Sequence, residues 1–176
     1  MVVDMKRSGV NRFILDKTCK FVTVDQVLKN LRRFHFMAKI DIADAYLQVA
    51  IHPSCYRLCG IYWRNRYYFF NRLPFGAKSA PRIFQGISDM IKFGLHRRCP
   101  SSFIENYLDD FLFWNSDRKI LSRHWTEAQK WMSKLGFTPK KTKLEGPTTC
   151  IKFLGVIIDT IGLSISLPEE KLQKLR

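Results

Sequence analysis

Two neighbouring carboxylates, Asp109 and Asp110, stand between strongly apolar runs in the segment "YLDDFLFW". Like charges this close repel, so the pair is costly unless a cation or a shared proton offsets the repulsion. A third carboxylate, Asp41, ends the apolar segment "FHFMAKID", with no His or Cys beside the trio to suggest a softer metal. Hard oxygen donors of this kind favour Mg²⁺. A proton-sharing dyad like that of aspartic proteases is the alternative, but the sequence lacks the Asp-Thr/Ser-Gly loops that such enzymes use.

The elements that must position these carboxylates follow from apolar spacing and turn residues. Helices are predicted at about 24–33 (with a Thr23 to Gln26 capping box), at about 79–94, from about 121 to a stop at Gly136, and at the start of "PEEKLQKLR". Strands are predicted up to Asp41, in a hairpin around Arg64-Asn65, in a hairpin with Asp109-Asp110 as its two-residue turn, in "CIKFLGVIID", and in "LSISL".

This order of elements predicts an α+β fold, a split βαβ antiparallel sheet with helices on one face. In such a sheet the first strand and the central hairpin are neighbours. We therefore expect Asp41, Asp109 and Asp110 to converge at one end of the sheet. Aspartate is also a common turn and cap residue, so each of the three has a purely structural interpretation when taken alone.

Composition narrows the class of protein. The chain has 176 residues, 46% of them hydrophobic, which is enough for one compact domain, or one domain with part of a neighbour. It contains no apolar run of the roughly 18 residues that span a bilayer, and its N-terminus lacks the apolar stretch of a signal peptide. We expect an intracellular protein without membrane partners; cytoplasm and nucleus are not distinguished. Five scattered cysteines indicate neither a disulfide framework nor a zinc site.

The net charge of +15 is unevenly distributed along the chain. Nine basic residues and one acidic residue lie between Arg57 and Arg98, interleaved with tyrosine, tryptophan and phenylalanine. This pattern suits a partner with a phosphate backbone and stacked bases. For this segment taken alone, the favoured interpretation is a solvated basic face above strand aromatics in a core. With the net charge, composition predicts a polyanionic partner without identifying it.

Five ordered blocks together resemble reverse transcriptases: "KIDIADAYLQV", "LPFGAKSAPRIFQ", "YLDD", "LGFTPKKTK" and "FLG". Phe75 stands where retroviral enzymes carry Gln, and in this respect the block "LPFGAKSAPRIFQ" is similar to that of retrotransposon reverse transcriptases. The tail from "LEGPTTCIKFLGVIID" onward is most similar to DIRS-type elements, with gypsy-like elements second. The resemblance implies a polymerase palm with part of the fingers.

The resemblance also implies chemistry, namely RNA-directed DNA synthesis by two-metal transfer of dNTPs to a primer 3′-hydroxyl. Two Mg²⁺ ions, for which Mn²⁺ can substitute, would be held by Asp41, Asp109, Asp110 and the backbone carbonyl of Ile42. Three lysines follow Gly136 where the family places one proposed to protonate pyrophosphate, and which of them matches stays open: Lys140, Lys141 and Lys143.

Further residues match family positions around the nucleotide and the nucleic acid. Tyr46 matches the aromatic steric gate that selects deoxynucleotides. The nucleotide-binding matches are Asp44, Ala45, Tyr46, Phe75, Gly76 and Lys78. The primer and template matches are Arg82, Gln85, Tyr107, Phe153, Leu154 and Gly155, with the last three in the primer grip.

By the same resemblance the chain divides into partial fingers (1–36), palm (37–51), a hairpin and nucleotide pocket (52–77), palm again (78–166) and the start of a thumb or connection (167–176). The family's triphosphate-clamping Lys and Arg would precede Val2, Val3 and Asp4, so we expect a fragment of a larger polyprotein. Expected partners are an RNA template, a DNA primer, dNTPs, and thumb, ribonuclease H, recombinase or integrase domains. The alternative is a non-catalytic nucleic-acid-binding module or an inactive remnant; Tyr46 and "YLDD" disfavour an RNA-dependent RNA polymerase.

Overall fold

The computed structural model describes residues 5, 7, 9–15 and 17–173, and Val2, Val3 and Asp4 lie outside them. The chain forms two compact units, which we describe separately. The sheet unit comprises residues 21–43 and 88–176, and the hairpin unit comprises residues 1–20 and 44–87. The division of the chain into fingers, palm and thumb given above remains a prediction.

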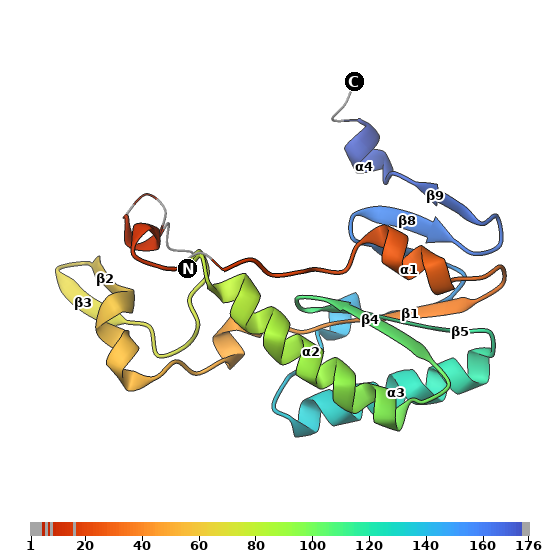
Figure 1. Ribbon diagram of the computed structural model, residues 1–176, viewed down its shortest axis with the longest axis horizontal. Coiled ribbons are helices and arrows are strands. Elements are labelled where there is room, and N and C mark those ends of the chain that lie inside the picture. Colours follow the sequence, from red (N-terminus) through yellow and green to blue (C-terminus); the bar gives the residue numbers. More distant parts are fainter. Residues whose placement is uncertain (1–4, 6, 8, 16, 174–176) are drawn as a thin grey trace. The chain divides into compact units, whose positions relative to one another are not determined.

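The sheet unit is built on a four-stranded antiparallel sheet in the order β4-β5-β1-β6 (Figure 1). Its strands are β4 (Phe103–Tyr107), β5 (Asp110–Asn115), β1 (Phe36–Asp41) and β6 (Glu145–Thr148). Because β1 pairs with β5, the first strand and the central hairpin are neighbours. The predicted α+β palm fold is confirmed.

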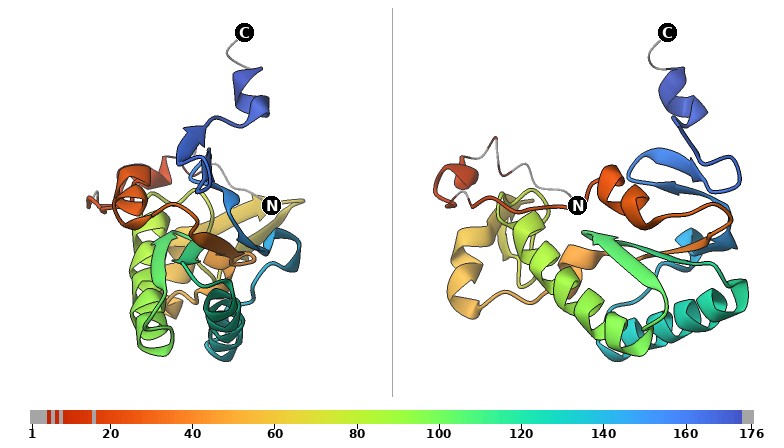
Figure 2. Two further views of the ribbon diagram at one scale, coloured as in Figure 1. Left: turned by 90° about the vertical axis from the view of Figure 1, so that its right-hand side faces the viewer. Right: turned by 45° about the vertical axis from the view of Figure 1, so that its right-hand side comes forward.

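Helices cover one face of this sheet (Figure 2). They are α3 (Arg118–Lys134) and the part of α2 (Ala80–Arg98) that begins at Ser88. Strand alternation turns Ala38 and Ile40 of β1 and their partners Phe113 and Phe111 of β5 to one face, where all four are buried. The α3 helix ends as predicted, with Gly136 at φ 88 directly after its cap.

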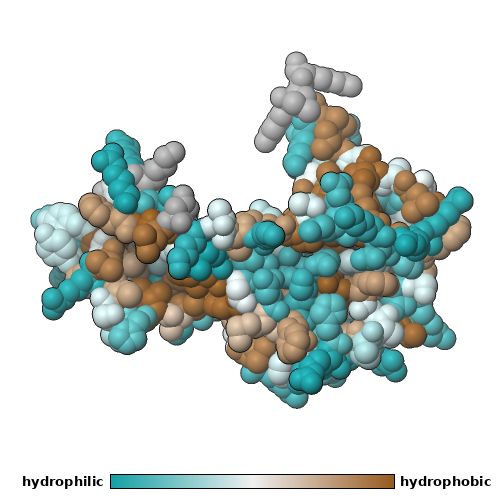
Figure 3. Space-filling model, in the orientation of Figure 1, coloured by the Kyte–Doolittle hydropathy of each residue, from teal (hydrophilic) through white to brown (hydrophobic). Residues whose placement is uncertain are grey.

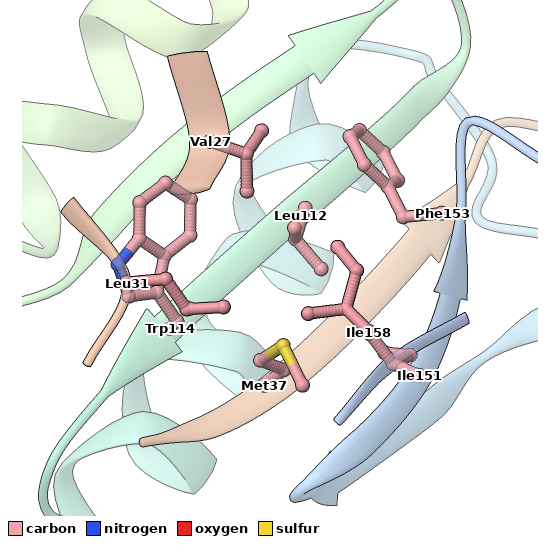
Figure 4. Packing of buried hydrophobic residues seen from close by; sticks show 8 residues of the cluster. All are labelled: Val27, Leu31, Met37, Leu112, Trp114, Ile151, Phe153 and Ile158. Atoms are coloured by element: carbon pink, nitrogen blue, oxygen red, sulfur yellow. The ribbon is translucent and has the colours of Figure 1, made fainter. Parts of the chain in front are cut away.

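A second apolar layer covers the opposite face (Figure 4). It consists of α1 (Val24–Asn30) and an antiparallel sheet of β7 (Cys150–Phe153), β8 (Val156–Asp159) and β9 (Ser164–Ser166). The buried side chains between this layer and the four-stranded sheet are Val27, Leu31, Met37, Leu112, Trp114, Ile151, Phe153 and Ile158. The predicted Thr23 to Gln26 capping box starts α1. The short helix α4 (Glu169–Leu172) follows β9.

Two sequence-based expectations about this unit were wrong in detail, and one strand was missed. The segment "CIKFLGVIID" forms two strands, β7 and β8, because Leu154 and Gly155 adopt positive φ and reverse the chain. The turn of the β4–β5 hairpin is Leu108-Asp109, since Asp110 already pairs with Tyr107. Strand β6 was not predicted because its Gly and Pro are typical of loops; a Cβ at Gly146 would lie 2.6 Å from Ala38 Cα, so the close pairing requires glycine.

The hairpin unit has a smaller core of buried Met5, Leu73, Ala77 and Ala80. It contains 3₁₀ helices at Val10–Arg12, Ala45–Gln48 and Pro53–Cys59, the hairpin β2 (Gly60–Trp63) with β3 (Arg66–Phe69), and the start of α2. The hairpin turns at Arg64-Asn65, as predicted, with φ of 48 and 59. None of the helices among the described residues combines the length and apolarity that crossing a bilayer needs.

Candidate active site

Asp41 and Asp110 face each other across the β1–β5 ladder. They are direct partners in the antiparallel register, so their side chains leave the same face of the sheet. This is the face opposite α2 and α3, because Ala38 and Ile40 alternate with Asp41 along β1. Like charges directly opposite each other destabilise a ladder, so the pair needs a compensating cation or proton.

Asp109 lies in the turn beside them. The Ile42 N–H donates to the Asp109 carbonyl at 3.0 Å, which ties the turn to the end of β1. The first turn residue, Leu108, has φ 52, a conformation that non-glycine residues rarely adopt. The Ser88 hydroxyl donates to the Leu108 carbonyl at 2.5 Å, and the Asn106 amide donates to Ser88 Oγ at 2.9 Å. The turn is therefore held from two sides.

Lys143 supplies the positive charge next to the aspartates. Its Nζ contacts Asp41 Oδ2 at 2.6 Å, and the Asp41 side chain is only 5% exposed while that of Lys143 is 51% exposed. The segment that carries Lys143 is fixed to β1, because the Lys140 N–H donates to the Asp41 carbonyl at 2.7 Å. Of the three lysines that sequence left open, Lys143 is the one with an ion pair to a candidate site residue among the described residues.

Burial and mutual repulsion raise the carboxyl pKa values. Burial raises the pKa of Asp110 to about 6, and the charges of Asp41 and Asp109 and a hydrogen bond with Asp41 add to the rise, against the lowering effect of Lys39. Burial also raises the pKa of Asp109. The hydrogen bond to Asp41 raises the pKa of Lys143, so its ammonium persists. Burial therefore disfavours the ionised forms of Asp109 and Asp110.

The arrangement of the donors is not that of a preformed metal cage. Across the described residues, no three His, Cys, Asp or Glu side chains are arranged to hold an ion. Asp41 instead engages the Lys143 ammonium, which occupies a carboxylate oxygen that a divalent cation would need. The donor type nevertheless fits Mg²⁺, because the side chains of Asp41, Asp109 and Asp110 are all carboxylates and a cation already contacts Asp41.

The sequence-predicted nucleotide residues lie in the hairpin unit, where two of them meet. The Tyr46 ring packs edge-on against Phe75, with centroids 5.1 Å apart, and against Phe84 at 5.5 Å. Asn11 brackets the "PFGAK" segment: its Nδ2 donates to the Gly76 carbonyl and its Oδ1 accepts from the Lys78 N–H, both at 2.9 Å. These two hydrogen bonds of Asn11 were not predicted, because a single Asn gives no sequence signal of a contact with a segment more than 60 residues away.

The remaining matches differ in exposure. Ala45 and Gln85 are buried, whereas Asp44 and Arg82 are exposed. In the sheet unit the Tyr107 ring lies 5.3 Å from that of Phe21. Phe153 is buried in the core, while Leu154 and Gly155 are half-buried in the β7–β8 turn, where the Lys171 ammonium donates to the Gly155 carbonyl at 2.9 Å.

Comparison with known sequences identifies a family. The profile of the family described as "Reverse transcriptase (RNA-dependent DNA polymerase)" matches residues 5–158. An "Enzymatic polyprotein" of Cestrum yellow leaf curling virus is 29% identical over 99% of this chain. A "Retrovirus-related Pol polyprotein from transposon opus" of Drosophila melanogaster is 27% identical over 93% of the chain. The chain spans 26% and 16% of the length of these two relatives.

Solved structures show the same fold. The foamy viral protease-reverse transcriptase in complex with double-stranded DNA matches with a TM-score of 0.82 and 21% identity, over 99% of this chain and 29% of that one. The same viral protein in complex with an RNA/DNA hybrid matches with a TM-score of 0.80, over 99% and 22%. With a family profile that matches most of its length, the chain belongs to the reverse transcriptase family.

Proposed function

We propose that this chain is the palm, with part of the fingers, of an RNA-directed DNA polymerase encoded by a retroelement. Its reaction is transfer of a deoxynucleotide to a primer 3′-hydroxyl on an RNA template. The observation that carries the proposal is the cross-strand pair Asp41–Asp110 with Asp109 in the adjoining turn. A module that only binds nucleic acid gains nothing from unneutralised carboxylates facing a phosphate backbone.

The family generally uses divalent metal ions, and the three aspartates fit that use here. Asp41, Asp109, Asp110 and the carbonyl of Ile42 would hold two Mg²⁺ ions, or Mn²⁺ in their place. Bound there, the ions would supply a more acidic primer hydroxyl and charge neutralisation on the leaving pyrophosphate. Burial raises the pKa of Asp109 and Asp110, so their ionised forms are disfavoured without a metal. A bound cation would stabilise those ionised forms.

Lys143 is the proposed general acid. Its ammonium already lies within hydrogen-bonding distance of Asp41, so release from that carboxylate leaves a charged donor beside the reacting phosphates. Lys143→Met is expected to lower the rate of nucleotide addition by about 100-fold or more. The same change at exposed Lys141, two residues away, is the matched control, and equal losses would contradict the assignment.

Tyr46 is the proposed gate against ribonucleotides. Its ring is held between those of Phe75 and Phe84, which fixes its position at low cost in side-chain entropy. Gly76 at φ 88 and the bracket from Asn11 would shape the segment that faces the incoming nucleotide. Replacing Tyr46 with Ala is expected to admit ribonucleotides.

Primer extension with labelled dNTPs on an RNA template tests the function. Incorporation should require Mg²⁺ or Mn²⁺ and be abolished in Asp109→Asn, while the exposed helix carboxylate variant Asp25→Asn behaves as the native chain. If the native chain incorporates no nucleotide, the native chain and Asp109→Asn are compared again, each fused to the thumb segment of a family member. Nucleic-acid binding without incorporation in that fusion would overturn the proposal and identify a non-catalytic module.

Partners and lineage follow from the relatives. The viral and transposon relatives are polyproteins, and the solved foamy viral complexes hold double-stranded DNA and an RNA/DNA hybrid. These names support template, primer and further polyprotein domains as partners of this chain. A DIRS-type origin, with a gypsy-like origin second, is inferred from the tail segment alone.

A further inference from the structure

The β2–β3 hairpin exposes aromatic rings on both of its faces. Every residue from Gly60 to Phe69 is exposed except the half-buried Ile61. The exposed rings keep between 41% and 76% of their surface: Tyr62, Trp63, Tyr67, Tyr68 and Phe69. A two-stranded hairpin with no buried face is marginally stable in water, so rings in these positions call for an explanation other than a core.

The register divides the rings between the two faces. Tyr62 pairs directly with Tyr67, and their ring centroids lie 4.9 Å apart. On the other face Trp63 lies diagonally across from Tyr68, at 6.2 Å between centroids. Trp63, Tyr68 and neighbouring Ile61, Phe69 and Phe70 line a hollow of about 340 Å³. The hollow is apolar, open and walled by flat rings, as a site that stacks planar groups would be.

Positive charge surrounds these rings. The Arg64 guanidinium lies 4.3 Å from the Trp63 ring centroid, and Arg66 occupies the ladder position opposite Trp63. Arg57 and Arg72 flank the hairpin in sequence and are also exposed. From Ala45 to Ser88 the sequence contains no Asp or Glu. Figure 3 shows hydrophobic and hydrophilic side chains side by side over this part of the molecule.

We propose that the β2–β3 hairpin binds single-stranded nucleic acid, with bases stacked on Trp63 and Tyr68 and phosphates neutralised by Arg64 and Arg66. Charge complementarity selects this occupant, because a surface without carboxylates attracts a polyanion, and flat rings stack bases without regard to sequence. The proposal deepens the proposed function by giving its template strand a contact surface in the hairpin unit. It requires none of the three aspartates.

Fluorescence anisotropy with a labelled oligothymidylate, in buffer with EDTA, tests the proposal. Trp63→Ala and Tyr68→Ala are each expected to weaken single-strand binding at least about fivefold. Trp63→Phe should retain most of the affinity because a ring remains. Arg66→Gln should reduce the slope of log affinity against log salt by about 0.7, the value for one lost phosphate contact on a single strand.

Phe93 provides the matched control. It is 68% exposed on α2, and the Arg97 guanidinium lies 5.8 Å from its ring centroid, so it repeats the ring and cation outside the hairpin. Phe93→Ala should bind as the native chain does. If primer extension fails while single-strand binding still depends on the hairpin, the result counts against the polymerase proposal and leaves the hairpin proposal standing.

Three results would overturn the inference. One is equal single-strand affinity in Trp63→Ala, Tyr68→Ala and the native chain, with circular dichroism showing all three folded. Another is equal loss of blunt-duplex and single-strand binding in the hairpin variants, which would make the surface a general phosphate contact. The third is a dimer in sedimentation that Trp63→Ala dissociates, which would identify a second copy as the occupant of the rings.

Discussion

The two hairpins of this chain, β4–β5 and β2–β3, share a local design and differ in their surroundings. Each has a two-residue turn whose first residue is a large side chain at positive φ, Leu108 in one and Arg64 in the other. The β4–β5 hairpin pairs with β1 through β5, whose residues from Phe111 to Asn115 are all buried, and it carries acids at its turn. The β2–β3 hairpin is exposed on both faces and carries arginines at its turn.

The same motif serves two purposes because the two hairpins differ in burial. A buried hairpin can hold charged groups at fixed positions, because the ladder to β1 and the hydrogen bonds from Ser88 and Asn106 leave the turn little freedom. The burial that fixes these carboxylates also raises their pKa, which prepares them for a cation. An exposed hairpin offers rings and charges to a partner instead of holding a fixed geometry.

The two hairpins should differ most in the stability that is lost when their tryptophan is replaced. Trp114 of β5 is 1% exposed and Trp63 of β2 is 50% exposed. Trp114→Ala should lower the free energy of unfolding by about 3–5 kcal/mol, because it leaves a cavity in the core. Trp63→Ala should lower it by no more than about 1 kcal/mol. Urea titration followed by circular dichroism measures both, and similar losses would show that the β2–β3 hairpin belongs to the folding core.

The next effect concerns the charge of Asp110. Its folded-state pKa of about 6 lies above the ordinary value of 3.8, so the folded chain binds this proton more tightly than the unfolded chain. The resulting stability is complete below about pH 4 and is lost as the pH rises through about 6. Asp110→Asn should therefore stabilise the metal-free chain by about 1–2 kcal/mol at pH 8, with allowance for the partial exposure of the carboxyl.

Thermal melts in EDTA at pH 4 and pH 8 measure this difference. The gain from Asp110→Asn should be largest at pH 8 and much smaller at pH 4, where Asp110 is protonated in the folded chain and partly protonated in the unfolded chain. Asp25→Asn, at an exposed helix carboxylate, is the control and should show no such pH-dependent gain. Destabilisation by Asp110→Asn at pH 8 would mean that Lys39 and Lys143 already neutralise the cluster.

Sequence patterns predicted the parts of the fold that local chemistry determines. The Thr23 to Gln26 capping box and the Gly136 stop are set by hydrogen bonds and φ preferences within a few residues, and both were found. The convergence of Asp41 with the 109–110 pair followed from the order of elements, because few topologies place a first strand beside a later hairpin.

Features that depend on the tertiary environment were missed. Ladder pairing with β1 makes Asp110 a strand residue and moves the turn to Leu108-Asp109, although Leu is a poor turn residue. Strand β6 forms at a sheet edge despite its Gly and Pro, because β1 offers free backbone groups there. Lys143 could not be separated from its neighbours by sequence, since only the fold decides which ammonium reaches Asp41.

A smaller effect is expected from removing the Lys143 ammonium beside Asp41. Lys143→Met removes the ammonium that contacts Asp41, so Mn²⁺ no longer competes with it for that carboxylate. The variant should bind Mn²⁺ about two- to fivefold more tightly, a modest gain because Lys143 is half exposed and its ion pair is screened. Electron paramagnetic resonance titration of free Mn²⁺ measures the affinity. Weaker binding than in the native chain would show that Lys143 orients Asp41 for the metal.

The smallest effect compares the two turns directly. A non-glycine residue at positive φ costs about 1–2 kcal/mol, and glycine at the same position costs about 0.5–1 kcal/mol in chain entropy. Leu108→Gly and Arg64→Gly should therefore each stabilise the chain by about 0.5 kcal/mol in thermal melts. Their functional effects should separate: Leu108→Gly frees the turn that holds Asp109 and slows nucleotide addition, whereas Arg64→Gly removes the cation over Trp63 and weakens single-strand binding alone. If each variant impaired both readouts, the two hairpins would form one functional surface.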